Sequence, residues 1–82
     1  MTTKPDENGR YPIESSNLAA TRWDARYNAR VGVVEIEFRS GGVYRYYGVP
    51  YEVYRGLRRS KSPGRYFHRT IKGNFHFEKV AP

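Results

Sequence analysis

The sequence contains no cysteine, and it has only one methionine and one tryptophan among its 82 residues. Without cysteine the chain forms neither a disulfide nor a thiolate zinc site, and it suits a reducing compartment. Long apolar runs are also missing, because none approaches the ~18 residues of a membrane-spanning helix. The N-terminal residues lack the hydrophobic core of a signal peptide. We therefore expect a cytoplasmic protein with no membrane association.

Recognised catalytic motifs are missing as well. The two histidines, His68 and His76, stand at no motif spacing from a carboxylate, and neither belongs to a metal-binding signature. A pairing in space of His68 with Asp24 or Glu78 stays open at this point. A chain of 82 residues has a small core and little room for an elaborate active site. The sequence thus predicts no enzyme activity, no cofactor and no metal.

Acidic side chains are scarce in the second half of the chain. Residues 38–82 carry ten basic and two acidic side chains, whereas residues 1–37 carry five basic and six acidic ones. The formal net charge of +7 is therefore concentrated in one half of the sequence. Such clustering favours a polyanionic partner, although small domains also use surface charge for solubility.

Period-two alternation predicts most of the strands. In residues 31–39, Val34, Ile36 and Phe38 alternate with glutamates, and a Gly-rich turn at 40–42 returns the chain as an antiparallel strand over 43–49. Within residues 13–27, Leu18, Ala20 and Arg22 fall on one face of a predicted strand and Ala19, Thr21 and Trp23 on the other, whereas residues 24–30 look like a connection. Residues 74–80 alternate again and close the sheet.

Residues 1–12 are polar and interrupted by proline and glycine, which predicts a flexible N-terminal arm ahead of a domain over 13–80. Between the strands, Pro50 marks the start of a helix. Its helical wheel places one apolar stripe opposite three arginines. The stripe contains Val53, Tyr54 and Leu57, and the arginines are Arg55, Arg58 and Arg59.

A corner of serine, proline and glycine over residues 60–64 leads into a second, shorter helix. Ser62 fits an N-cap with Pro63 in the first helical position, and Gly73 fits the residue that ends the helix. Phe67 and Ile71 would pack inward. The predicted fold is α+β, with an antiparallel sheet of about four strands in the order β-β-β-α-short α-β and one amphipathic helix packed on it.

The candidate binding residues gather on the two helices and the corner between them. Arginine suits forked contacts with phosphate and stacking on bases. Helix N–H groups beside serine and basic side chains are a common cradle for anions. With one strand residue added, the candidates are Arg45, Arg55, Arg58, Arg59, Lys61, Ser62, Gly64, Arg65, Tyr66, Arg69 and Lys72.

The order and spacing of many residues resemble a known family, the KTSC domain. The resemblance spans roughly residues 15–77 and differs from the common family pattern at Trp23, where tyrosine is frequent, and at His68, where asparagine is frequent. The residues that carry it are Ser15, Ser16, Asn17, Trp23, Asp24, Val34, Ile36, Phe38, Gly42, Tyr44, Tyr46, Val49, Pro50, Ser62, Gly64, Tyr66, Phe67 and Ile71.

The family resemblance implies a small module that stands alone in bacterial and phage proteins and is appended to the C-terminus of some lysyl-tRNA synthetases. Attachment to a tRNA-charging enzyme suggests contact with RNA, by association only. We therefore expect a non-catalytic binding module for nucleic acid, with RNA first. The alternatives are an accessory protein that sequesters a small nucleotide and a module that binds an acidic protein surface. Pairing of strand edges into a homo-oligomer also stays open.

Overall fold

The protein folds around one antiparallel sheet, seen in a computed structural model that describes residues 4–7, 9–26, 28 and 30–82. The five strands lie side by side in chain order, so each strand pairs with the next along the sequence. They are β1 (Tyr11–Pro12), β2 (Leu18–Asp24), β3 (Val31–Phe38), β4 (Val43–Pro50) and β5 (Phe77–Ala81).

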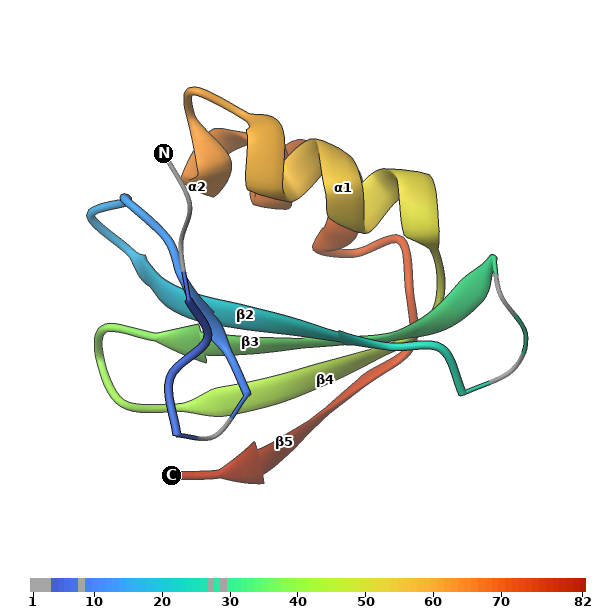
Figure 1. Ribbon diagram of the computed structural model, residues 1–82, viewed down its shortest axis with the longest axis horizontal. Helices are drawn as coiled ribbons and strands as arrows, with labels where there is room; N and C mark the ends of the chain where they lie inside the picture. Colours follow the sequence, from blue (N-terminus) through green and yellow to red (C-terminus); the bar gives the residue numbers. More distant parts are fainter. Residues whose placement is uncertain (1–3, 8, 27, 29) are drawn as a thin grey trace.

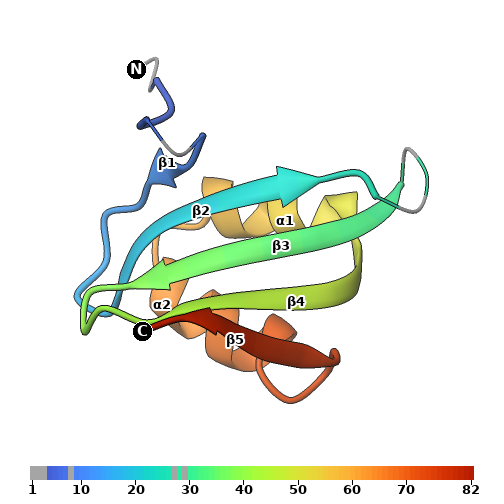
Figure 2. The same ribbon diagram turned by 90° about the horizontal axis from the view of Figure 1, so that it is seen from below.

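Helical segments cover only one face of this sheet (Figure 1). They are α1 (Tyr51–Arg59), α2 (Pro63–Tyr66) and a π-helical turn, η1 (Phe67–Ile71), that continues α2. In Figure 2 the opposite face has no helix in front of it; α1 lies behind β2 and β3, and the orange α2–η1 segment lies behind β4 and β5. The predicted α+β class is confirmed, with one strand more than expected.

The hydrophobic core fills the space between the helices and the sheet. Of the predicted inward residues, Tyr54, Leu57, Phe67 and Ile71 are buried and Val53 is half-buried. The three arginines of α1 are exposed, as the helical wheel predicts. Gly73 has a φ of 83° and ends η1, a conformation that favours glycine. The core residues are Ile13, Leu18, Val34, Ile36, Tyr46, Val49, Tyr54, Leu57, Phe67 and Ile71.

Strand β2 departs from the predicted alternation. Leu18 and Trp23 both pack in the core, although regular alternation places them on opposite faces. The pairing of β2 with β3 shifts between Leu18 and Ala20, and an extra residue of this kind reverses the side of the residues that follow. Arg22 therefore lies on the face without helices, opposite Glu35. Residues 27 and 29 of the predicted connection lie outside the described residues.

Residues 11–12 belong to the sheet, whereas the sequence prediction assigns residues 1–12 to an arm. Tyr11 pairs with Thr21 and Pro12 pairs with Ala20. These contacts depend on a partner strand further along the chain, which local composition does not reveal. Residues 1–3 and 8 of the predicted arm lie outside the described residues. Among the described helices, none is long and apolar enough to cross a membrane.

Candidate nucleic-acid interface

The first helix presents a row of exposed arginines: Arg55, Arg58 and Arg59. Burial of Leu57 on the opposite side of α1 fixes this orientation. The three arginines line a depression of about 290 Å³ together with Tyr54 and Tyr51, whose side chain is 42% exposed. Aromatic rings and guanidinium groups thus share one part of the surface, an arrangement that suits both phosphate and base contacts.

The linker, α2 and η1 add four more exposed cations to those of α1. We call the seven the basic face: Arg55, Arg58, Arg59, Lys61, Arg65, Arg69 and Lys72. Within the described part of the chain, none of the seven forms an ion pair with a carboxylate. Glu52 is the only acidic residue between positions 51 and 72, and it forms no ion pair with Arg55 three positions later. The positive charge of this face is therefore not neutralised by described neighbours.

Tyr66 holds the second helical segment against the first. Its hydroxyl donates a hydrogen bond to the main-chain oxygen of Val53 at 2.9 Å. A Cβ atom at Gly56 would lie 2.2 Å from the same hydroxyl, so only glycine allows this approach. Tyr66 was predicted to contact the ligand, but the structure places its half-buried ring between α1 and α2. Its contribution is to position the cations around it.

The corner between the helices is formed as predicted, but it does not assemble a phosphate cradle. Ser62 precedes Pro63 at the start of α2, yet the Ser62 hydroxyl makes no capping hydrogen bond, and α2 has only four residues. Gly64 lies beside Ser15, whose Oγ would be 3.3 Å from a Cβ at position 64. The adjacent cleft, of about 400 Å³, is lined by Pro12, Ile13, Glu14, Leu57, Arg58, Ser60, Lys61 and Pro63.

That cleft includes the acidic Glu14, and neither Arg45 nor Arg69 is among the residues that line it. A small nucleotide would need several cations converging on its phosphates. The structure brings Arg58 and Lys61 to this cleft and leaves the other predicted cations elsewhere. The predicted small-nucleotide site therefore lacks its convergent set of residues.

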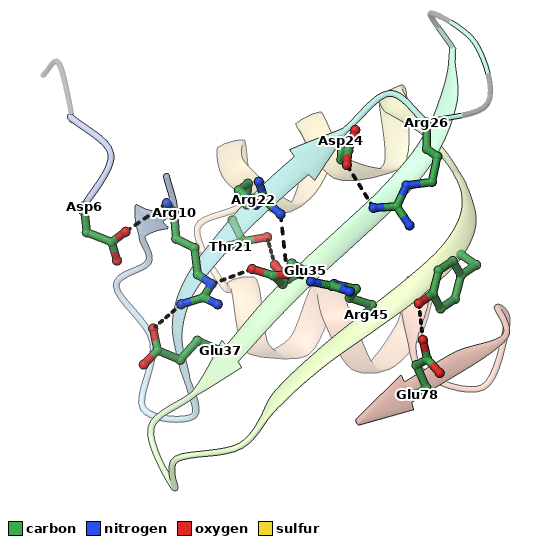
Figure 3. Close-up of polar contacts among 11 residues, drawn as sticks. Asp6, Arg10, Thr21, Arg22, Asp24, Arg26, Glu35, Glu37, Arg45 and Glu78 are labelled. Atoms are coloured by element: carbon green, nitrogen blue, oxygen red, sulfur yellow. Dashed lines mark hydrogen bonds and ion pairs between the residues drawn. The ribbon is translucent and has the colours of Figure 1, made fainter. Parts of the chain in front are cut away.

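Arg45 is separated from the basic face, because it lies on the face of the sheet without helices. It stands directly opposite Glu35, and Arg22 stands opposite Glu35 on the other side. Figure 3 shows three arginines converging on this carboxylate; we call Glu35, Arg10, Arg22 and Arg45 the sheet-face cluster. The distances to the Glu35 oxygens are 2.7 Å from Arg10 Nε, 3.0 Å from Arg45 Nε and 3.6 Å from Arg22 Nη2.

Glu35 is the centre of this cluster and its side chain is only 6% exposed. Burial by itself raises the pKa of Glu35, but hydrogen bonds from Arg45 and Arg10 and the charges of Arg10 and Arg22 hold it below the ordinary 4.5. The hydrogen bond to Glu35 in turn raises the pKa of Arg45. Arg45 is thus paired with a carboxylate, and the sequence prediction that groups it with the helix cations needs this correction.

Sequence reasoning did not anticipate the sheet-face cluster. The sequence signal for this cluster is the alternation, which places Glu35 and Arg45 on the non-core faces of their strands. The register that sets them opposite each other, and the approach of Arg10 from the N-terminal segment, depend on tertiary structure. Loss of one member of such a cluster is costly, because a buried carboxylate needs cationic partners.

A groove lined by aromatic rings, also not anticipated, runs between the sheet and η1. It has a volume of about 490 Å³, and Phe77 at its edge is 50% exposed. Lys72 belongs both to this aromatic groove and to the basic face, so the two surfaces meet at the end of η1. The lining residues are Asn17, Phe38, Ser40, Tyr44, Tyr46, Phe67, His68, Lys72, Gly73 and Phe77.

The positions of the two histidines and of the possible metal ligands can be compared within the part of the chain that the structure describes. No group of three or more histidine, aspartate or glutamate side chains is placed there to hold a metal ion. His68 is exposed at the aromatic groove and His76 packs against the ring of Tyr47 on the opposite face of the sheet. The two histidines thus lie on different sides of the sheet.

Comparison with known proteins gives a consistent family assignment. The family model of the KTSC domain matches residues 14–75. A crystal structure of a KTSC domain protein from Yersinia pestis superimposes with a TM-score of 0.79 at 33% identity, covering 88% of this chain and 96% of that one. An uncharacterized protein of Stutzerimonas stutzeri is 36% identical over 63 residues, which are 77% of this chain and 83% of that protein.

Two cyanobacterial enzymes are also similar over part of their length. A lysine–tRNA ligase of Trichormus variabilis is 41% identical over 56 residues, and that of a Nostoc species is 39% identical over 56 residues. The alignment covers 68% of this chain but only 10% of each ligase. The chain therefore spans about a tenth of the length of these curated relatives.

Proposed function

This chain belongs to the KTSC domain family, and we propose that it is a non-catalytic module that binds the phosphate backbone of nucleic acid, RNA first. The contact surface is the basic face. The observation that carries the proposal is that its seven exposed cations have no carboxylate partner within the described residues. A cation without a carboxylate partner is available to a ligand without first breaking an ion pair, although Arg58 also stacks on the ring of Tyr11, with Cζ 3.9 Å from the ring centroid.

Backbone binding requires several cations that act together, since each contact with a phosphate releases bound counterions. Five of the seven cations are arginines, whose planar guanidinium groups donate two parallel hydrogen bonds to a phosphate. The exposed ring of Tyr51 lies among the arginines of α1, where it offers a base a stacking surface. Charge and aromatic surface therefore occur together, as in many modules for single-stranded nucleic acid.

The relation to lysine–tRNA ligases favours RNA over DNA as the ligand. These enzymes act on a transfer RNA by their name, and the segment that resembles this chain is a small part of them. An accessory RNA contact is a role that suits a segment of that size. The proposal includes a cytoplasmic location, which is the expectation from the sequence.

The test is a fluorescence-anisotropy titration of single-stranded RNA, duplex RNA, duplex DNA and free nucleotides over a series of salt concentrations. We expect affinity for RNA to fall steeply with salt, by a slope of about 0.7 for each neutralised phosphate of a single strand. Arg55→Glu combined with Arg59→Glu should abolish binding while the circular dichroism spectrum is unchanged.

The matched comparison uses single charge reversals at two exposed arginines. Arg59→Glu lies on the basic face, whereas Arg26→Glu lies in the connection after β2 and loses only an exposed pairing with Asp24. We expect a tenfold or larger loss for Arg59→Glu, on the order of one charge-assisted contact, and a loss below about threefold for Arg26→Glu. If Arg59→Glu and Arg26→Glu lowered RNA affinity equally, net charge and not the basic face would account for binding. Unchanged affinity in the Arg55→Glu, Arg59→Glu double variant would overturn the proposal.

A further inference from the structure

We infer that the aromatic groove receives an unpaired base of a single-stranded RNA whose backbone lies on the basic face. This inference rests on the proposed function and adds a specific site to it. The groove lies at the edge of the sheet where β5 meets η1, next to the helix end that carries Lys72. It would make the module distinguish single-stranded from duplex RNA, because a paired base is not free to enter.

The apolar surface of the groove is made of rings. Phe77 is the outermost ring, and it contacts Tyr44 and Tyr46 with centroid distances of 5.9 Å and 5.5 Å. Behind them Phe38 and Phe67 pack edge to face, with centroids 5.5 Å apart. The inner rings are thus held by neighbours, while the outer ring of Phe77 stays half exposed. A rigid ring with a free face is the feature on which a base stacks.

The rim of the groove is cationic. Lys72 lines it from the end of η1, and Lys79 Nζ lies 6.0 Å from the centroid of the Tyr44 ring. Among the described residues, none that lines the groove is acidic. A nucleotide brings its phosphate within a few ångströms of its base, so cations beside exposed rings fit a nucleotide unit as a whole.

The polar lining residues give the base something to recognise. Asn17 and Ser40 line the groove with the rings, and both are exposed. Their side chains offer hydrogen-bond donors and acceptors of the kind that base edges use. A base can pair with these groups while it stacks on the rings, whereas an aliphatic side chain can only cover the rings, so the lining favours a planar polar ligand.

The experiment measures binding of an unstructured RNA of about 12 nucleotides, with 2-aminopurine at one position in each of a set of oligonucleotides, and of the matching duplex. We expect 2-aminopurine fluorescence to be quenched on binding, because stacking quenches this base. Phe77→Ala should remove the quenching and lower single-strand affinity roughly 5- to 100-fold, the range of one base–aromatic stack. Duplex affinity should change by less than about twofold, since backbone contacts persist.

Two further variants control for the fold. Phe77→Trp keeps a stacking surface and should retain quenching and single-strand affinity. His76→Ala removes the adjacent exposed ring, which packs on Tyr47 on the other face, and should change neither. Loss of affinity in Phe77→Ala without recovery in Phe77→Trp would overturn the stacking inference.

The same titrations separate this inference from the proposed function. If Phe77→Ala binds single strands as well as the wild type, and the double reversal at Arg55 and Arg59 still abolishes binding, the groove inference fails and the basic face stands. If wild-type protein binds no RNA at all, both fail. Binding of an acidic protein in place of RNA would likewise overturn both.

Discussion

The two faces of the molecule use the same side chain for opposite purposes. On the helix side, arginines of α1, α2 and η1 stand exposed without a described carboxylate partner. On the sheet side, Arg10, Arg22 and Arg45 converge on the buried Glu35 (Figure 3). The first set is available to a ligand, and the second set is used by the fold.

One carboxylate makes this difference. Glu35 lies at the middle of β3, with neighbouring strands on both sides, so arginines on β2 and β4 reach it from opposite directions. No residue in the equivalent position neutralises the arginines of α1, because Glu52 stays unpaired within the described residues. A count of basic residues therefore overstates the charge that a ligand meets, and pairing across strands decides which cations are available.

The largest expected effect comes from removing the charge at the centre of the sheet-face cluster. Glu35→Gln leaves Arg22 and Arg45 without a counter-charge among the described residues and leaves Arg10 only its 3.8 Å contact with Glu37. We expect the free energy of unfolding to fall by about 2–3 kcal/mol. This is below the ~3–5 kcal/mol typical of fully buried pairs, because the arginines are partly exposed. Urea denaturation monitored by the fluorescence of Trp23 measures it.

Glu52→Gln is the matched control, since it removes the same charge from the helix side. We expect a change within about 0.5 kcal/mol, as for most exposed positions without a partner. If Glu35→Gln and Glu52→Gln destabilised the protein equally, the contrast between the two faces would be wrong. RNA affinity of folded Glu35→Gln should not decrease, because the variant frees positive charge.

Protonation of Glu35 in acid should weaken the sheet-face cluster as Glu35→Gln does. The pH dependence of stability therefore tests the role of this charge separately. The pKa of Glu35 lies below its ordinary value of 4.5 in the folded protein. A depressed pKa contributes stability that is fully present above the unfolded value and is lost as the pH falls through the folded value. The difference in unfolding free energy between wild type and Glu35→Gln should therefore shrink as the pH is lowered from about 6 to about 3. A constant difference would mean that Glu35 contributes through packing alone.

Local features of this fold were readable from the sequence. The alternation of β3, the inward face of α1, the Ser62–Pro63 helix start and the helix end at Gly73 each depend on residues close in the chain. The sequence predicts their positions because propensity, proline and glycine preferences and periodicity act over one or two turns or a few strand residues. The capping hydrogen bond that the sequence also predicts at Ser62 does not form.

Features that depend on register were not readable. The irregularity between Leu18 and Ala20 reverses the faces of β2, and β1 forms only against a strand already in place. The pairing of Arg45 with Glu35 follows from the same register, so Arg45 could not be separated from the helix cations beforehand. The aromatic groove likewise combines residues from four separate parts of the chain.

The smallest expected effects come from a matched pair of arginine substitutions, one on each face. Arg45→Gln loses a hydrogen bond to Glu35 and should lower the free energy of unfolding by about 1 kcal/mol, because its side chain is partly exposed. Its affinity for RNA should change by less than about twofold, since Arg45 contacts no phosphate in our proposal.

Arg55→Gln should do the reverse. Its side chain is exposed and has no carboxylate partner among the described residues, so the unfolding free energy should stay within about 0.5 kcal/mol of wild type. RNA affinity should fall by roughly 3- to 10-fold, and the slope of log affinity against log salt should drop by about 0.7, the signature of one lost phosphate contact on a single strand. Denaturation and salt titration give the unfolding free energy and the RNA affinity of both variants. If Arg45→Gln lost as much RNA affinity as Arg55→Gln, the helix side would not be the separate binding surface that we propose.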